Sequence, residues 1–151
     1  MFRGVANLNL DSKGRIAMPT RHREPLMELC GGRMVVTVDP DRCLLIYPFP
    51  EWVEIERKLN RLSNLNPRTR DLQRLLVGHA TESDMDGQGR MLVAPALRRF
   101  ADLEKKVVLI GQFNKFELWD EARWEAKCEA WRSGEGLTGE GLPEDLANLS
   151  L

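Results

Sequence analysis

Apolar and polar residues alternate near the start of the chain, on both sides of a short polar connection. Residues 7–18 read NLNLDSKGRIAM, which is the period-2 pattern of two strands joined by Ser12-Lys13-Gly14. A three-residue hairpin loop commonly ends in the left-handed region, which glycine reaches without steric cost. DGQGR at residues 86–90 repeats DSKGR at residues 11–15. We therefore predict two hairpin tips of the same construction.

The similarity between the two copies extends beyond the tips. DSKGRIAMPTRHR at 11–23 aligns with DGQGRMLVAPALRR at 86–99, with one extra residue before the second proline. In each copy a proline-led segment suited to a short helix follows, then two apolar runs around a polar turn, at 34–52 and 107–124. Two copies of one supersecondary unit are the simplest account. The predicted organisation is one unit at 1–52, a helical linker at 53–78, a second unit at 79–124, and a C-terminal helix end with an acidic tail at 125–151.

Helical periodicity is clearest after the first unit. Apolar residues spaced by three and four form one stripe of an amphipathic helix, at Trp52, Ile55, Leu59, Leu62 and Leu65. Asn66-Pro67 predicts a cap and a first-turn proline for another helix, through about Val77.

A further helix is predicted after the second unit, with Asp120 as its cap and a stop at Gly134. Its stripe of Trp124, Cys128 and Trp131 is interpreted as a core or subunit contact. The tail from residue 134 is glycine-rich and acidic, so we expect it to be mobile, or ordered only against a neighbour.

Composition favours a soluble protein that buries a core, with 42% hydrophobic and 30% charged residues. No stretch approaches the roughly 18–20 apolar residues of a membrane span, and the N-terminus lacks the apolar region of a signal peptide. We therefore expect a cytoplasmic protein. The cysteines and histidines show no CxxC or HxxxH spacing, so we expect reduced thiols and neither a metal nor a cofactor; they are Cys30, Cys43, Cys128, His22 and His79.

Charge is distributed unevenly, although the net charge is only −1. Residues 1–75 hold 13 Lys/Arg and 9 Asp/Glu, whereas residues 76–151 hold 9 and 14. Residues 1–23 contain five bases and a single acid, Asp11, and the chain from Ser133 onward contains four acids and no base. A basic front indicates a polyanionic partner at the N-terminal end.

These motifs resemble a known family. MFRG, NLDSKGR and MPTRHRE near the start, GHA and MDGQGR in the middle, and VLIGQFNKFELWDEARW later are similar to MraZ proteins, over essentially residues 1–132. MraZ proteins are bacterial transcriptional regulators with two tandem AbrB-like (SpoVT-AbrB, swapped-hairpin, double-psi-like) β units. The resemblance therefore implies an α+β fold with flanking helices.

The resemblance also implies a function and partners. It implies a DNA-binding protein of the nucleoid that assembles into ring-shaped homo-oligomers and needs no cofactor. The implied targets are short G-rich boxes repeated in a promoter. The implied role is control of the gene cluster for cell division and cell-wall synthesis, including the protein's own gene.

The Asp-Arg pair of each tip admits a structural and a functional interpretation. It can be an exposed cross-strand ion pair, which contributes little to stability. Alternatively, an exposed arginine on a hairpin can bond two guanine edge atoms or grip phosphates. Sequence neighbours favour the first tip, where Asp11 orients Arg15 and the surrounding bases are Lys13, Arg3, Arg21 and Arg23.

The second tip, Asp86 and Arg90, has Glu82, Asp84 and Gln88 nearby. We therefore expect it to contribute less to DNA binding than the first tip. Arg68, Arg70 and Arg74 form another basic cluster, for which a solvated helix face competes with a DNA contact. GGR at 31–33 is too short for a phosphate loop and leads into a strand.

Two other classes of function fit the sequence less well. Neither histidine lies near an obvious nucleophile or carboxylate motif, so we expect no enzymatic activity. An antitoxin-like protein-interaction module of the AbrB fold remains an alternative. Antitoxins usually carry one such unit and a toxin-wrapping tail, whereas this chain carries two units.

Overall fold

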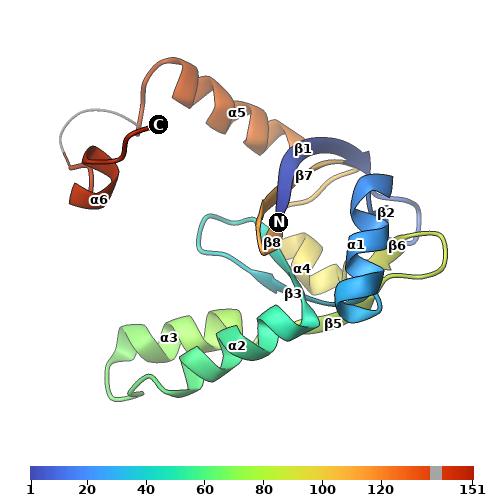
Figure 1. Ribbon diagram of the computed structural model, residues 1–151, viewed down its shortest axis with the longest axis horizontal. Coiled ribbons are helices and arrows are strands. Elements are labelled where there is room, and N and C mark those ends of the chain that lie inside the picture. The colour runs from blue at the N-terminus through green and yellow to red at the C-terminus, as the bar shows by residue number, and fades with distance from the viewer. Residues whose placement is uncertain (137–140) are drawn as a thin grey trace. The chain divides into compact units, whose positions relative to one another are not determined.

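The fold is α+β, as predicted, and combines antiparallel β-sheet with helices (Figure 1). A computed structural model describes residues 1–136 and 141–151. The strands are β1 Phe2–Asn9, β2 Arg15–Ala17, β3 Arg33–Val38, β4 Leu44–Pro48, β5 Thr81–Asp84, β6 Arg90–Leu92, β7 Lys106–Phe113 and β8 Lys115–Asp120. The helices are α1 Thr20–Cys30, α2 Phe49–Asn60, α3 Pro67–Leu76, α4 Pro95–Phe100, α5 Glu121–Arg132 and α6 Glu144–Ala147.

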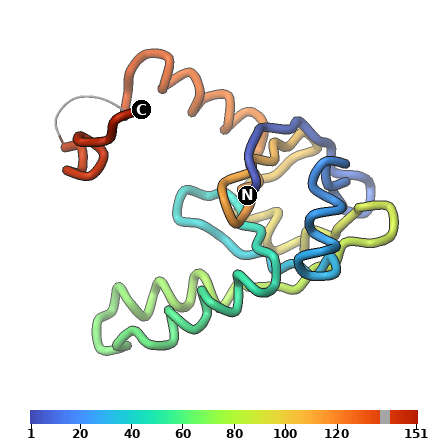
Figure 2. The backbone as a smooth tube through the Cα atoms, in the orientation of Figure 1, coloured from blue at the N-terminus to red at the C-terminus, as the bar shows by residue number. Residues whose placement is uncertain are grey.

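One six-stranded sheet is built from strands of both copies, in the order β1-β7-β8-β4-β3-β5. Strand β1 pairs with β7 along its whole length, from Phe2 opposite Phe113 to Asn9 opposite Lys106. Strand β4 pairs with β8, so a strand of the first copy again lies beside one of the second. The backbone trace shows this interleaving (Figure 2). Residues 1–121 accordingly form one compact unit, and the predicted repeat boundaries at 1–52 and 79–124 stay a prediction.

The strands on the two sides of each tip do not continue as a hairpin. Strand β2 pairs instead with β6 of the other copy, with Arg15 opposite Leu92 and Ala17 opposite Arg90. This short ribbon is closed at both ends, because the amide of Met18 donates to the Gly89 carbonyl at 2.7 Å and that of Val93 donates to the Gly14 carbonyl at 2.9 Å. The two tips are therefore exchanged, each one bonded to the chain that follows the other.

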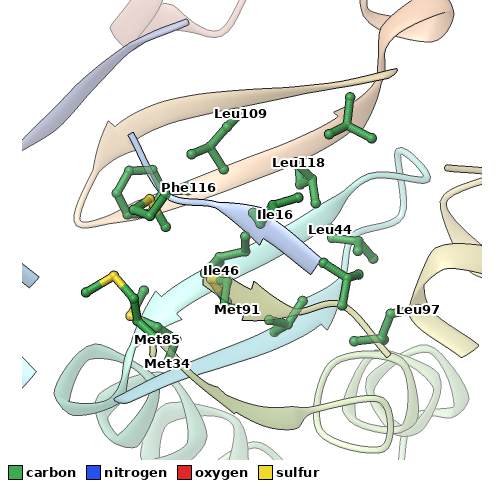
Figure 3. Packing of buried hydrophobic residues seen from close by; sticks show 14 of the residues in the cluster. Ile16, Met34, Leu44, Ile46, Met85, Met91, Leu97, Leu109, Phe116 and Leu118 are labelled. Carbon is green, nitrogen blue, oxygen red and sulfur yellow. The ribbon is translucent and has the colours of Figure 1, made fainter. Parts of the chain in front are cut away.

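The main hydrophobic core lies between this ribbon and one face of the large sheet (Figure 3). Ile16 of β2 and Met91 of β6 are paired and buried, and they pack into the same cluster as Ile46, Phe116 and Leu118. Alternation along β3 and β4 sends the intervening side chains to the opposite face. There they pack with α2 in a smaller cluster of Val35, Leu45, Tyr47 and Trp52. The tips and helix α2 thus belong to opposite faces of the sheet.

Helix α2 ends earlier than its apolar stripe predicts. Trp52 and Leu59 are buried, but Leu62 and Leu65 follow the last helical residue, Asn60, and are exposed. The stripe prediction is therefore wrong at its last two positions, where the chain turns toward α3. The predicted cap of α3 is confirmed, since the Asn66 side chain accepts the amide hydrogen of Arg68 at 2.8 Å. That helix closes at Leu76, with Val77 as its C-cap.

A second compact unit comprises Ala122–Leu151. Helix α5 begins directly after Asp120, where a helix start was predicted, and Gly134 with φ +84° follows its end. Trp124 and Trp131 contact each other edge to face, with ring centroids 5.4 Å apart. In the predicted acidic tail, helix α6 covers Glu144–Ala147, and residues 137–140 lie outside the described part of the chain.

Candidate nucleic-acid interface

The first tip is organised by the carboxylate of Asp11. Its Oδ1 accepts the amide hydrogens of Lys13 and Arg15, both at 2.9 Å, and its Oδ2 accepts Nε of Arg15 at 2.8 Å. Backbone bonds close the turn, since the Asp11 amide donates to the Arg15 carbonyl and the Gly14 amide donates to the Asp11 carbonyl. Gly14 has φ +80°, in the left-handed region that the tip was predicted to need. The predicted Asp-Arg contact is present, and it holds the Arg15 guanidinium by one nitrogen only.

The second tip repeats this construction atom for atom. Oδ1 of Asp86 accepts the amide hydrogens of Gln88 and Arg90, at 2.8 and 2.9 Å, and Oδ2 accepts Nε of Arg90 at 3.3 Å. Gly89 has φ +78° and donates its amide hydrogen to the Asp86 carbonyl. The second pair is looser, and its arginine side chain is 36% exposed compared with 25% for Arg15.

The same hydrogen bonds keep both carboxylates ionised. The amide of Arg15 lowers the pKa of Asp11 most, and the Arg15 side chain and the Lys13 amide lower it further. The amides of Arg90 and Gln88 lower the pKa of Asp86 in the same way. Each tip therefore carries a fixed negative charge that tethers its arginine at neutral pH.

The two copies align without an insertion, contrary to the extra residue expected before the second proline. In the ribbon, the amides of Met18 and Val93 donate to equivalent partners, the carbonyls of Gly89 and Gly14. Equivalent residues of the two copies therefore keep the same separation in sequence beyond both tips, and this separation is the offset between the copies. Pro19 is the N-cap of α1, whereas Pro95 is the first residue of α4. The prolines are at non-equivalent positions, which is possible because proline is tolerated where no helical N–H bond is needed.

This offset pairs Arg23 with Arg98 and places each beside the tip of the other copy. Nε of Arg98 donates to the Val93 carbonyl at 3.0 Å, and its guanidinium lies against Gly14 of the first tip. Nε of Arg23 donates to the Met18 carbonyl at 2.7 Å, and its guanidinium lies against Gly89 of the second tip. Arg23, expected near Arg15, therefore belongs to the second tip, and Arg98 was missed.

The other predicted bases lie at different distances from Arg15. Lys13 is an exposed residue of the first tip itself. Arg21, at the start of α1, reaches β1, where a side-chain carbon added at Gly4 would lie 3.0 Å from its Nη2. Arg3 is the neighbour of Gly4 at the start of β1, opposite Gln112. Only Lys13 is thus placed directly beside Arg15, and Arg3 and Arg21 are associated with β1.

The acids expected around Arg90 point away from it. Glu82 and Asp84 are opposite Val35 and Arg33 on β3, on the face that carries the α2 cluster. Ser83, between them, points the other way and donates its hydroxyl hydrogen to the Leu92 carbonyl of β6 at 2.6 Å. Successive side chains of a strand alternate between faces, so sequence proximity misled here. The acidic surroundings predicted for the second tip are therefore wrong.

The arginines of α3 have partners close by. Arg74 pairs with Asp71 at 3.0 Å, and Arg70 donates to the carbonyls of Asn64 and Leu65 at the helix start. These contacts support the structural interpretation of that cluster. Within residues 1–136 and 141–151, no helix is long and apolar enough to cross a membrane, and no three His, Cys, Asp or Glu residues are grouped to hold a metal ion.

The ribbon thus brings together Arg15 and Arg90 on its two tips, with Arg98 and Arg23 packed beside them. Comparisons with known proteins identify the family. The family model described as "MraZ protein, putative antitoxin-like" matches residues 1–75 and again residues 76–133. The chain therefore belongs to the MraZ family, and the predicted fold of two tandem AbrB-like units is confirmed.

Several relatives named "Transcriptional regulator MraZ" are similar to the chain over its full length or nearly so. The protein of Thioalkalivibrio sulfidiphilus is 59% identical over 93% of both chains. The proteins of Halorhodospira halophila and Escherichia coli (strain K12 / DH10B) are each 55% identical over 100% of both chains. Their shared name describes a transcription regulator, which is a non-enzymatic role. It supports both the predicted regulatory role and the expectation that the chain is not an enzyme.

Proposed function

We propose that this protein binds DNA in a sequence-specific way and regulates the division and cell-wall gene cluster, including its own promoter. The observation that carries the DNA-binding proposal is the tethering of Arg15 and Arg90 by Nε alone. In each case the aspartate fixes the plane of the guanidinium and leaves the two terminal nitrogens without a carboxylate partner among the described residues. The gene cluster and the G-rich boxes rest on the family resemblance.

This arrangement suits guanine recognition. An arginine reads guanine by donating two parallel hydrogen bonds to O6 and N7 in the major groove, which admits a two-stranded ribbon. A guanidinium that is already oriented loses less conformational entropy on binding. In this proposal Arg15 reads guanine with Asp11 as its orienting group. Lys13, Arg3, Arg21 and Arg23 add attraction to phosphates, and Asp86 and Arg90 form a second, weaker reading tip.

We also propose that the protein forms a ring-shaped homo-oligomer and is associated with the nucleoid. Strand β1 lies at the edge of the sheet, so one of its sides is open for pairing. Apolar side chains are exposed on and near it, including Val5 and Phe113, with Met27 and Leu29 on α1. Repeated subunits on repeated boxes turn weak single contacts into tight binding. Light scattering should report an assembly larger than a tetramer, and a monomer at micromolar concentration contradicts the ring.

A mobility-shift titration with the DNA upstream of the protein's own gene tests the DNA-binding proposal. The expected result is a shift that disappears when the G·C pairs of the repeated boxes are replaced by A·T pairs, while the same protein retains weak, salt-sensitive binding to the altered duplex. Equal affinity for both duplexes contradicts sequence-specific binding. Recovery of one stoichiometric toxic protein in place of DNA would favour the antitoxin-like alternative.

A further inference from the structure

We propose that Arg98 and Arg23 bind DNA phosphates and complete the two tips crosswise, Arg98 beside the Asp11 tip and Arg23 beside the Asp86 tip. This inference rests on the proposed function, because it assumes that the tips face DNA. It assigns a role to Arg98, which sequence proximity did not connect with either tip. It also moves Arg23 from the first tip to the second.

The two arginines are held in equivalent ways. Each lies near the start of the helix that follows its own strand. Each donates a hydrogen bond from Nε to the carbonyl of the residue five positions earlier, which is Met18 for Arg23 and Val93 for Arg98. Those same two residues donate their amides to the glycine carbonyls of the opposite tips. Met18 therefore links the Arg23 guanidinium to the second tip, and Val93 links the Arg98 guanidinium to the first tip.

Contact with the tip glycines fixes the guanidinium planes. Gly14 and Gly89 are buried, and a side-chain carbon on Gly14 would lie 2.8 Å from Cζ of Arg98. On Gly89 the added carbon would lie 2.2 Å from Nε of Arg23. Glycine is thus required at both positions for two reasons: the backbone has a positive φ there, and the arginine approaches closely. A guanidinium packed in this way is oriented before any ligand arrives.

Neither arginine has an acidic partner among the described residues. Both side chains are half-buried, yet no carboxylate in the described part of the chain pairs with either guanidinium. Ion pairs do form elsewhere in the described chain, as between Arg42 and Asp102. A partly desolvated guanidinium with free terminal nitrogens favours a bidentate oxyanion.

Phosphate fits this position better than a base edge. Arg15 and Arg90 lie on the ribbon that enters the groove, whereas Arg98 and Arg23 lie on helices that flank it. Flanking groups meet the sugar-phosphate strands at the borders of a groove, and such contacts fix register without reading sequence. The two tips and their crossed arginines then form one reader with two base-reading and two phosphate-binding groups.

The test measures affinity against salt for two duplexes, the promoter box and a scrambled sequence, by fluorescence anisotropy. Arg98→Met keeps an unbranched stem over Gly14 and removes the charge. The matched control is Arg57→Met, which removes the same charge from α2 on the opposite face, where Arg57 pairs with Glu54. Arg98→Met should weaken binding to both duplexes by the same factor and lower the salt slope by about one for each engaged subunit, with Arg57→Met leaving the slope unchanged.

A merely structural role of Arg98 predicts a lower Tm with an unchanged salt slope, and that result overturns the inference. Arg23→Met provides an independent second variant at the other tip, and Arg98→Gln replaces Arg98→Met if the latter fails to fold. Arg15→Ala in the same series separates this inference from the proposed function. If Arg15→Ala abolishes specific binding and neither crossed arginine changes the slope, only the inference fails. If Arg15→Ala also leaves binding unchanged, the proposed DNA face fails with it.

Discussion

The two tips share one backbone and one set of hydrogen bonds, yet they differ in what surrounds them. The first has Lys13 in its turn and a tight ion pair at 2.8 Å, and the second has Gln88 and a looser pair at 3.3 Å. The helix that follows the first tip, α1, has 11 residues, whereas α4 has 6. The two copies thus share the construction of the tip and differ in its setting.

The difference between the tips is smaller than the sequence indicates. Glu82 and Asp84, the acids that distinguish the second tip in sequence, lie on the opposite sheet face, and Arg23 takes their place beside it. What remains is a serine and a lysine in place of a glycine and a glutamine, and a more firmly held arginine. Both tips should therefore matter for DNA binding, with the first dominant.

The largest expected effect comes from Arg15→Ala compared with Arg90→Ala. Arg15→Ala removes an oriented donor pair from every subunit, at roughly 1–3 kcal/mol of discrimination per bidentate contact, so specific binding should be lost. Arg90→Ala should weaken binding less, because its pair with Asp86 is longer and its tip lacks a lysine. Anisotropy titrations on promoter DNA measure both variants.

Both variants must first show the wild-type oligomer size by gel filtration, since a broken assembly would also lose affinity. Loss of binding with Arg90→Ala and retention with Arg15→Ala would reverse the order of the tips. Equal losses would show that the two tips read DNA as equivalent halves.

The next effect concerns stability and compares Gly89→Ala with Gly14→Ala. Alanine in the left-handed region costs about 1–2 kcal/mol at either position. The added carbon would overlap more severely at Gly89, where Nε and Cδ of Arg23 lie 2.2 and 2.6 Å away. At Gly14 the closest atom is Cζ of Arg98, at 2.8 Å. The free energy of unfolding in urea should fall for both and more for Gly89→Ala.

Gly87→Ala is the matched control within the same turn. Gly87 lacks a positive φ, and a side-chain carbon there meets nothing within 4 Å. Its stability should stay close to that of the wild type. A loss at Gly87 as large as that at Gly89 would mean that the turn, and not the crossed arginine, limits stability.

Features that depend on local sequence could be predicted, whereas the pairing of distant strands could not. The tip glycines, the Asp-Arg contacts and the Asn66 cap depend on residues within a few positions, and all three predictions are confirmed. The pairing of β2 with β6 depends on strands far apart in the chain. Arg98 could have been found from its spacing to Arg23, had the prolines not been aligned at non-equivalent helix positions.

A smaller effect should follow from pH, because only the first copy has a titrating residue in its core. His22 of α1 is buried against Phe2 and Phe116, with ring centroids 5.7 and 5.0 Å away, and the constant offset places Leu97 at its counterpart. Burial, and then the positive charge of Arg21, lower the pKa of His22. Below the ordinary histidine pKa of about 6.5, the unfolded chain binds a proton that the folded chain does not.

The free energy of unfolding should therefore decrease as pH falls from about 6.5 toward the lowered pKa of His22, and be independent of this residue above that range. His22→Leu copies the second repeat and should remove that part of the pH dependence. Urea titrations at several pH values on both proteins isolate the His22 contribution by difference. Identical pH profiles would show that this histidine is neutral or charged to the same extent in both states.

The smallest effect tests the one charged difference that remains inside the tips. Gln88→Lys gives the second tip the lysine of the first, and Lys13→Gln does the converse. Lys13 and Gln88 are both exposed, and only their backbone amides bond to the tip aspartates. Exchanging the side chains should therefore leave Tm unchanged.

A lysine that meets a phosphate raises the salt slope by about one per engaged subunit, so Gln88→Lys should bind more tightly at low salt and Lys13→Gln less tightly. Neither change should alter the preference for G-rich over scrambled DNA, because a lysine beside a phosphate carries no sequence information. A change in that preference would place residue 13 or residue 88 against a base, and Lys13 would then belong with Arg15 among the residues that read sequence.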